Sequence, residues 1–522
     1  MSHVSITAEA ATDIAAHARE LIESLMLRPW GQVSTSVYET GRIVALAPWL
    51  TGHRERLDYL TGAQSLDGAW GAPDGYGLVP TLSATEAILT ALAREDPDTD
   101  RERLTQAAER GLRRLAAWLG GGRIDLPDMP AIEHIVPSLV ALINRHLQNL
   151  PDHAPLPLPE GMSYDSLDRV TSWIGSGGAI PEKLLHALEI AGDKAGGAPS
   201  VQPASIGTVG ASPAATAAWL AGRDADGPAR EHLEAVVRRH GGPVPVGLPI
   251  TVFERGWVLS WLARAGVPVE VPPEMVADLR TAIGPGGTPA GPGLPADADT
   301  TSVALYALAL LGAPHEPDSL WSFRSGSHFS TWLGEQGMSV SVNAHVLDAF
   351  GEYVRRRPAA APRYEQTISE VAAWVRERQE PDGSWRDRWH ASPYYATVSC
   401  ALALASFGGA ASAEPVRAAV EWVLDSQRPD GSWGRWEGTA EETAYALQIL
   451  LLTGDRTDAR LLRAAAAGEE YLTRWAGKEH PPLWHDKDLY VPLAVTRSAV
   501  IAAAHLARRA REGTRPPDGA PS

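Results

Sequence analysis

The sequence predicts an all-α protein of the (α/α) barrel type, and three observations lead to this expectation. Apolar residues recur at helical period along most of the 522 residues, whereas alternating β-type runs are scarce. A short motif, Gln-x-x-Asp-Gly-x-Trp, appears three times with the same spacing, which is typical of helices arranged in repeated pairs. The length allows two or three domains, each with a full-sized core.

In chain order, residues 7–29 carry the pattern of an amphipathic helix, and helical patterning resumes after residue 33. The repeated motif follows as Gln64–Trp70 and returns as Gln379–Trp385 and Gln427–Trp433. Asp-Gly favours a turn, glutamine can cap a helix end, and tryptophan can cover the corner. We therefore expect each copy to join an outer helix to an inner one.

Composition excludes several classes of function. A net charge of −17 and a pI near 5.4 argue against a nucleic-acid partner, because no extended basic track can form. Lysine occurs only four times, so arginine or a metal ion must supply most of the positive charge for an anionic ligand. Cys400 is the single cysteine, which excludes internal disulfides and Cys-rich zinc sites and fits a reducing cytosol.

Membrane and targeting segments are not expected. The longest apolar runs are too short to span a bilayer, and the N-terminal residues lack a basic segment followed by an apolar core. We therefore expect a cytoplasmic protein without stable membrane insertion. The segment after Arg508, rich in Arg, Pro and Gly, is predicted to be disordered.

The segment with the strongest chemical signal runs from Gly293 to Leu308 and contains Asp297 and Asp299. Pro295 precludes a helix upstream, and the apolar run after Ser302 predicts a buried helix that begins at the two carboxylates. An ordinary helix N-cap is the plainer interpretation of this pattern.

Together with the repeats, the Asp-x-Asp-Thr-Thr sequence resembles the general-acid motif of the class II terpene cyclases. The resemblance runs nearly from end to end, and within the family it is closest to bacterial halimadienyl, copalyl and drimenyl diphosphate synthases. It rests on these segments in order: Val33–Thr40, Gln64–Trp70, Glu133–Leu139, Ser212–Ala217, Phe253–Trp257, the acid motif and Trp389–Tyr395.

The resemblance implies a βγ didomain of two (α/α) barrels with the active site between them. Residues 1–50 and 275–508 would form the β domain, residues 51–274 an inserted γ domain, and residues 509–522 a disordered tail. No Asp-Asp-x-x-Asp motif exists in the sequence, so we expect the diphosphate of the substrate to be retained in the product.

The resemblance assigns the acid chemistry to Asp299 as proton donor and Asp297 as its electrostatic partner. Repulsion between two close carboxylates would keep a proton on the pair, and the helix N-terminus would stabilise the carboxylate left after transfer. Thr300 replaces the usual fourth aspartate. Asn343 occupies the place of an asparagine that hydrogen-bonds the donor, and His345 is either a second catalytic group or an interior histidine.

The resemblance also suggests residues that would stabilise the carbocation and end the reaction. Aromatic rings can stabilise a cation by roughly 0.5–2 kcal/mol each, and the candidates are Phe253, Trp257, Trp389, Tyr394 and Tyr395. His186 matches a histidine that holds a terminating water in plant relatives, but the partner asparagine is replaced by Val246. His186 is therefore either a base or a pocket wall.

For the diphosphate, the resemblance implies Mg²⁺ near Asp125 and Asp128, although a capped loop is an equally simple interpretation of this segment. Arg169, Lys487 and Arg497 are the candidate phosphate contacts.

Three alternatives share parts of these patterns. A squalene-type cyclase would be longer with more repeats, a protein prenyltransferase subunit would need a zinc site, and a glycosidase would usually separate its carboxylates. A non-catalytic scaffold is a fourth possibility. Geranylgeranyl diphosphate is favoured over farnesyl diphosphate as substrate on family grounds only, and a downstream diphosphate-processing enzyme is a possible partner.

Overall fold

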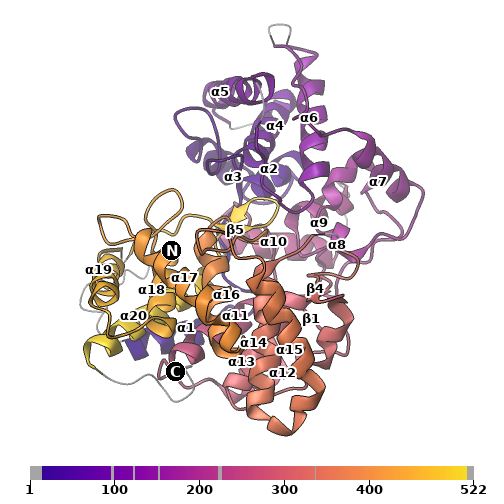
Figure 1. Ribbon diagram of the computed structural model, residues 1–522. Helices are drawn as coiled ribbons and strands as arrows, with labels where there is room; N and C mark the ends of the chain where they lie inside the picture. The colour runs from indigo at the N-terminus through magenta and orange to yellow at the C-terminus, as the bar shows by residue number, and fades with distance from the viewer. Residues whose placement is uncertain are drawn as a thin grey trace.

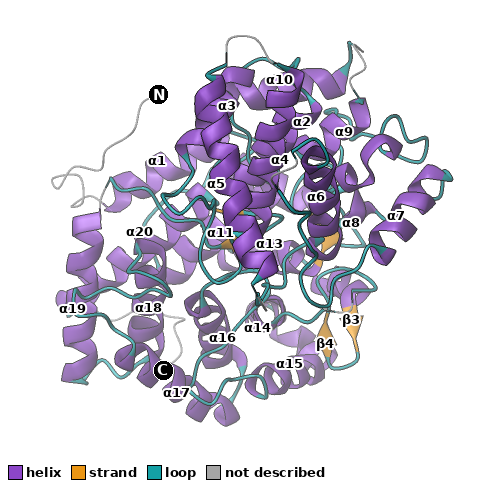
Figure 2. Cartoon of the chain, turned by 90° about the horizontal axis from the view of Figure 1, so that it is seen from above, coloured by secondary structure: helices purple, strands orange, loops and turns teal. Residues whose placement is uncertain are grey.

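The computed structural model describes residues 14–95, 99–121, 124–150, 153–221, 226–335, 337–475 and 477–513. Over these residues the chain is mainly helical, and strands occur only as short hairpin segments (Figure 2). The predicted all-α class is therefore confirmed. None of the helices over these residues combines the length and the apolar character that crossing a bilayer requires.

The chain forms two groups of helices, one above the other in Figure 1. The helices of the first half are α1 (Ile14–Leu27), α2 (Val37–Leu46), α3 (His53–Gly62), α4 (Leu78–Arg94), α5 (Arg101–Gly120), α6 (Ile132–Leu147), α7 (Asp165–Gly175), α8 (Glu182–Leu185), the 3₁₀ helix η2 (Leu188–Lys194), α9 (Pro213–Leu220) and α10 (Pro228–His240). Those of the second half are α11 (Thr251–Ala265), α12 (Pro273–Ala282), α13 (Ala298–Leu310), η3 (Pro317–Phe323), α14 (Val340–Arg356), η4 (Pro358–Ala360), α15 (Ala361–Arg376), α16 (Pro393–Phe407), η5 (Ala410–Ser412), α17 (Ala413–Asp425), α18 (Ala440–Thr453), α19 (Ala459–Trp475) and α20 (Leu493–Arg511).

Over the described residues, the strands form two-residue antiparallel pairs. They are β1 (Thr288–Pro289) with β2 (Ala296–Asp297), β3 (Arg324–Ser325) with β4 (His328–Phe329), and β5 (Trp484–His485) with β6 (Leu489–Tyr490). The first pair leads directly into α13, so it fixes the start of the helix that carries the two aspartates.

The second barrel is a closed ring of inner helices. In order, α11, α13, α14, α16, α18 and α20 pack side by side, and α20 returns to α11. The helices α1, α12, α15, α17 and α19 pack against the outside of this ring. Inner helices such as α13 are buried at almost every position, whereas outer helices such as α19 bury one face only, which is why the two kinds differ in sequence.

The first barrel is smaller and is closed by α2, α4, α6, η2 and α9, the last of which returns to α2. Its outer elements are α3, α5, α7 and α10. The apolar core around α4 and α6 is separate from the core of the second barrel.

The packing corrects the predicted domain edges at both ends. The predicted β domain includes α2, but this helix is an inner element of the first barrel. The predicted γ domain includes α11, but this helix closes the ring of the second barrel. Helical periodicity shows that a segment has a buried face but not which core covers it, so the sequence alone could not locate either edge.

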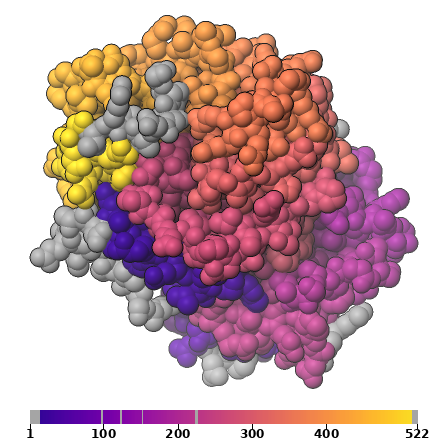
Figure 3. Space-filling view, turned by 90° about the horizontal axis from the view of Figure 1, so that it is seen from below, coloured from indigo at the N-terminus to yellow at the C-terminus, as the bar shows by residue number. Residues whose placement is uncertain are grey.

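The N-terminal helix crosses over to the second barrel. Figure 3 shows it as an indigo band beside the yellow C-terminal helix, and α1 packs on α20. The predicted disordered tail is wrong for its first residues, because α20 continues to Arg511. Residues 514–522 lie outside the described residues.

Each copy of the repeat joins an outer helix to an inner one, as predicted. The indole N–H of Trp70 donates to the carbonyl of Leu60 at 2.7 Å, and Trp385 and Trp433 donate to the carbonyl ten residues earlier in the same way. The glutamine amide donates to the glycine carbonyl of its own turn and to a backbone carbonyl at the next outer helix. The motif therefore fastens consecutive helix pairs together.

Candidate active site

Asp297 is the N-cap of α13. Its Oδ1 accepts a hydrogen bond of 2.6 Å from the backbone N–H of Thr300, and its backbone has the extended geometry usual for this position. The Thr301 hydroxyl donates to the carbonyl of Asp297 at 2.5 Å. The plainer interpretation of Asp297 as a cap is therefore correct, but it does not exclude an electrostatic role.

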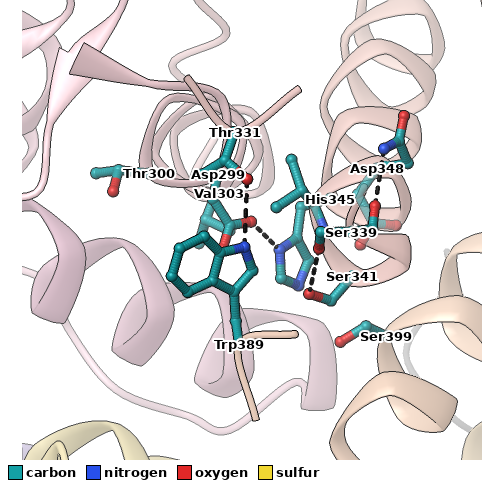
Figure 4. A network of polar contacts seen from close by, with 12 residues as sticks. Asp299, Thr300, Val303, Thr331, Ser339, Ser341, His345, Asp348, Trp389 and Ser399 are labelled. Carbon is teal, nitrogen blue, oxygen red and sulfur yellow. Dashed lines mark hydrogen bonds and ion pairs between the residues drawn. The ribbon is translucent and has the colours of Figure 1, made fainter. Parts of the chain in front are cut away.

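Asp299 lies in the first turn of the same helix, and its carboxylate is bound to a histidine of the neighbouring inner helix. Nδ1 of His345 on α14 is 2.6 Å from Oδ1 of Asp299 (Figure 4). The side chain of Asp299 is 14% exposed and that of His345 is 9% exposed, so both groups are largely shielded from water. Thr300 lies on the other side of α13 from His345 in this view.

The two carboxylates are arranged to retain a proton. Burial, and then the negative charge of Asp299, raise the pKa of Asp297 from 3.8 to about 7, although hydrogen bonds from Thr300 act in the opposite direction. The N-terminal end of α13 favours a carboxylate in its first turn. The pair can therefore hold one proton near neutral pH and stabilise the anion that remains after the proton leaves.

The predicted hydrogen bond from Asn343 to Asp299 is not formed. The amide of Asn343 donates to the carbonyls of Phe329 and Ser339 at 2.9 and 2.8 Å, and its oxygen accepts from the Phe329 N–H at 2.8 Å. Asn343 therefore attaches β4 to α14. Its side chain points to the backbone because the buried N–H and C=O of Phe329 would otherwise lack partners. His345, two residues later, makes the contact instead.

Aromatic rings surround the histidine. The ring of Trp257 meets His345 edge to face at 5.5 Å and lies 4.2 Å from the ring of Phe253. Its indole N–H donates to the hydroxyl of Tyr395 at 3.0 Å. Trp484, which the sequence analysis missed, packs 4.7 Å from Tyr395 and 5.7 Å from Phe253. Nothing in the local sequence indicated that Trp484 belongs to the site, because the β5–β6 hairpin brings it to this cluster only in the folded protein.

The other two aromatic candidates lie in different places. The indole of Trp389 lies beside the carboxylate of Asp299 in Figure 4 and donates to the hydroxyl of Thr331 at 3.2 Å. Tyr394 instead packs on Trp422 of the outer helix α17, with ring centroids 4.6 Å apart. Adjacent residues of a helix point in different directions, so Tyr394 and Tyr395 cannot both face the same cavity.

Comparison with known proteins agrees with this geometry. Residues 336–476 match the squalene-hopene cyclase C-terminal domain. The chain is 41% identical to an ent-copalyl diphosphate synthase of Streptomyces sp. (strain KO-3988), with 95% of this chain and 97% of that protein aligned, and equally identical to a copalyl diphosphate synthase of Streptomyces cyslabdanicus over 95% and 96%. A solved ent-copalyl diphosphate synthase from Streptomyces platensis superposes with a TM-score of 0.91 at 44% identity, covering 95% of this chain and 99% of that one.

The chain belongs to the bacterial class II diterpene cyclases. It is a protonation-initiated terpene cyclase of the isomerase type, in agreement with the paired aspartates at the N-terminus of α13.

Lys487 of the cyclase is not available to a diphosphate. Its side chain is fully buried, and its ammonium group is paired with Glu39 and, at 2.9 Å, with Glu189. It also donates to the carbonyl of His186 and the hydroxyl of Ser212. This ammonium group has enough acceptors for all its protons, so Lys487 joins the β5–β6 hairpin of the second barrel to the first barrel.

His186 belongs to the same junction between the barrels. Its Nδ1 lies 2.6 Å from the carbonyl of Gly210 and its Nε2 lies 2.8 Å from Oδ1 of Asp486. Burial alone would lower the pKa of His186, but the charge of Asp486 outweighs it and the net pKa is raised. Each ring nitrogen lies against an oxygen acceptor, so neither nitrogen is free to take the proton that ends the reaction. Of the two interpretations of His186, the geometry favours the structural one.

The remaining two basic candidates lie at outer helices of the barrels. Arg497 pairs with Glu20 at 2.9 Å and so attaches α1 to α20 on the outside of the second barrel. Arg169 is exposed on α7, an outer helix of the first barrel (Figure 1).

Two arginines that the sequence analysis missed do lie where the barrels meet. Arg435 contacts the hydroxyl of Tyr76 at 3.3 Å and Oδ2 of Asp74 at 3.2 Å, and its side chain is 25% exposed. Arg388 contacts Oδ1 of Asp128 at 3.1 Å and is 18% exposed. Each of these two guanidinium groups thus links the second barrel to a loop of the first barrel.

The acidic loop of the cyclase offers hard oxygen ligands but no closed metal cage. Asp128 is paired with Arg388, and over the described residues no group of three or more His, Cys, Asp or Glu side chains gathers around one point. Asp125 and Asp128 therefore fit only a cation whose other ligands are phosphate oxygens and water, an arrangement that Mg²⁺ favours.

Proposed function

We propose that the enzyme cyclises geranylgeranyl diphosphate to a bicyclic diphosphate and leaves the diphosphate group intact. The observation that carries this proposal is the shielded contact of Asp299 with His345 beside the rings of Trp257 and Trp389. The copalyl diphosphate synthases to which the chain is 41% identical support a C20 substrate.

In the proposed mechanism Asp299 protonates the terminal alkene. An alkene is a weak base, so the acid must be neutral beforehand and its anion must be stabilised afterwards. Burial and the charge of Asp299 raise the pKa of the neighbouring Asp297 to about 7, so the pair of carboxyl groups can keep the proton that Asp299 donates. The N–H of His345 and the N-terminal end of α13 supply the second condition.

The carbocation then migrates through a pocket walled by aromatic rings. Trp257, Phe253, Tyr395 and Trp484 form a continuous group of rings next to the acid. Their faces attract a cation but do not add to it, and they exclude water that would end the cascade early.

We propose that the diphosphate binds at the rim between the barrels, which we define by Arg388 and Arg435. These two arginines replace the three basic residues that were predicted from the sequence. Guanidinium groups bind phosphate oxygens in a bidentate manner. Mg²⁺, held by Asp125 and Asp128, would neutralise part of the phosphate charge when bound. The product keeps its diphosphate, so we further propose that the enzyme works in the cytoplasm and passes the product to a diphosphate-processing enzyme.

The test is incubation of the purified protein with geranylgeranyl and with farnesyl diphosphate, followed by dephosphorylation and mass spectrometry. We expect a bicyclic C20 alcohol from the first substrate. A bicyclic C15 alcohol alone would instead support the farnesyl diphosphate cyclase that the sequence left open. If both substrates were recovered as linear alcohols, the proposed function would be wrong.

A further inference from the structure

A small cavity of about 20 Å³, with room for about one water molecule, lies inside the second barrel next to His345. It is bounded by α11, α13, α14 and α16, and Asp348 and Ser399 are among its lining residues, but Asp299 is not. In Figure 4 the ring of His345 stands between Asp299 and Asp348. The histidine therefore separates the acid from this cavity.

The cavity contains polar groups that protein atoms do not satisfy. Asp348 is 2% exposed, and its Oδ1 has no hydrogen-bond partner, while its Oδ2 pairs with Arg264. The indole N–H of Trp261, also at the wall, has none either. Tyr306 accepts a hydrogen bond of 2.8 Å from Arg264 and keeps its own proton to donate. A cavity with several such groups is suited to hold water.

The ionisable groups continue along one face of α14. His345, Asp348 and Glu352 follow at intervals of three and four residues, so they lie one above the other on the helix. Glu352 is fully buried, and it pairs at 2.8 Å with Arg356, whose side chain is 43% exposed. The eleven residue steps from His345 to Arg356 span about 16 Å at 1.5 Å per step. The column thus connects the acid to the far end of the barrel.

We propose that this column and the water of the cavity return a proton to Asp299 after each turnover, with Asp348 as the relay group next to His345. The inference rests on the proposed function. Burial raises the pKa of Asp348, although Arg264 opposes this, so a protonated state is accessible to the carboxyl group.

The protons balance in the following way. Asp299 loses one proton when its O–H bond breaks and the C–H bond of the substrate forms. Nε2 of His345 then takes a proton from cavity water, and Nδ1 releases one to the carboxylate of Asp299. The water is reprotonated by Asp348, which regains its proton from the surface through the column. Rotation of the Asp299 carboxyl group and exchange of the His345 tautomer through the same water reset the pair.

The experiment compares the first turnover with the following ones. Asp348→Asn removes the relay proton and preserves size. In rapid-quench assays with geranylgeranyl diphosphate we expect the first turnover to stay within about twofold of wild type, because Asp299 is already protonated. Later turnovers should be slower by about tenfold or more, as for loss of other proton-transfer groups. Product should therefore appear as a burst of one equivalent, and the solvent deuterium isotope effect on kcat should rise.

Asp278→Asn is the matched control, because its exposed carboxylate pairs with an arginine, Arg255, outside the cavity. It should change neither phase. Equal slowing of both phases by Asp348→Asn would indicate a structural role and overturn the inference, as would an unchanged kcat. If Asp348→Asn does not fold, Glu352→Gln leaves the pair with Arg264 intact and is read by the same criteria. Failure of wild type to convert the substrate would refute the proposed function instead.

Discussion

Nδ1 of His345 lies 2.6 Å from Oδ1 of Asp299. This contact joins two inner helices of the second barrel, α13 and α14, at the place where the reaction begins. A nitrogen that donates to one carboxyl oxygen leaves the other to carry the acidic proton, and the same N–H stabilises the anion after transfer. His345, and not Asn343, therefore makes the contact with the donor that was predicted for the asparagine.

Replacement of Asp299 by asparagine tests the donor directly. We expect turnover to fall by about 10²–10⁴-fold or more, because the amide cannot protonate an alkene. Folding should be retained, since the side chain keeps its size. Product formation by mass spectrometry and the melting temperature check both expectations. Activity close to wild type would remove Asp299 from the donor role.

His345→Gln and His345→Phe separate hydrogen bonding from packing. The amide of glutamine can still donate toward Asp299, whereas phenylalanine keeps only the ring contact with Trp257. We expect kcat to fall about 10²-fold in the phenylalanine variant and less in the glutamine variant, with little change in KM. Steady-state kinetics of the two proteins measure the difference. An equal loss in both would argue that only the ring matters.

The raised pKa of Asp297 predicts how stability depends on pH. Its folded-state pKa is about 7, above the ordinary value of 3.8. The protonated form is therefore favoured in the folded protein, and this stability is fully present below pH 4 and is lost as pH rises through 7. Asp297→Asn does not titrate and retains a capping side chain.

The melting temperature of Asp297→Asn, relative to that of wild type, should therefore increase as the pH is raised from 4 to 8. A shift of about three units corresponds to roughly 4 kcal/mol at most. Wild-type activity should fall over the upper part of the same range, as the pair loses its shared proton. A difference in melting temperature that does not change with pH would contradict this prediction.

Lys487→Met tests whether the buried lysine is structural. We expect a loss of about 3–5 kcal/mol of stability, because the carboxylates of Glu39 and Glu189 are left buried without their cation. KM for the substrate should stay near wild type in the protein that does fold. Thermal unfolding and kinetics at low temperature provide the two measurements. A large rise in KM without loss of stability would restore Lys487 as a phosphate contact.

Arg435→Gln and Arg388→Gln test the rim between the barrels. Loss of a charged contact to the diphosphate should raise KM about tenfold or more, since hydrogen bonds to charged groups contribute about 1.5–3 kcal/mol. Arg497→Gln is the matched control, because it removes an arginine pair on the outer face of the second barrel. If all three variants had the same KM, the diphosphate would have to bind elsewhere.

The sequence by itself determined the features that depend on neighbouring residues. Capping of α13 by Asp297, the helical periods and the Gln-to-Trp turns all involve groups within about ten residues of each other. The acid motif could be located for the same reason. Such short-range interactions depend only on residues that are close together in the sequence, so the all-α class and the position of the acid could be predicted.

Only the tertiary structure decided which distant groups meet. Lys487 finds Glu189 at a separation of 298 residues, and Asp299 finds His345 at a separation of 46. The same holds for α11, whose place in the second barrel depends on closure of a ring of helices and not on its own pattern. A buried lysine and a phosphate-binding lysine look identical in sequence, because the environment that neutralises the charge is assembled only when the two barrels pack together.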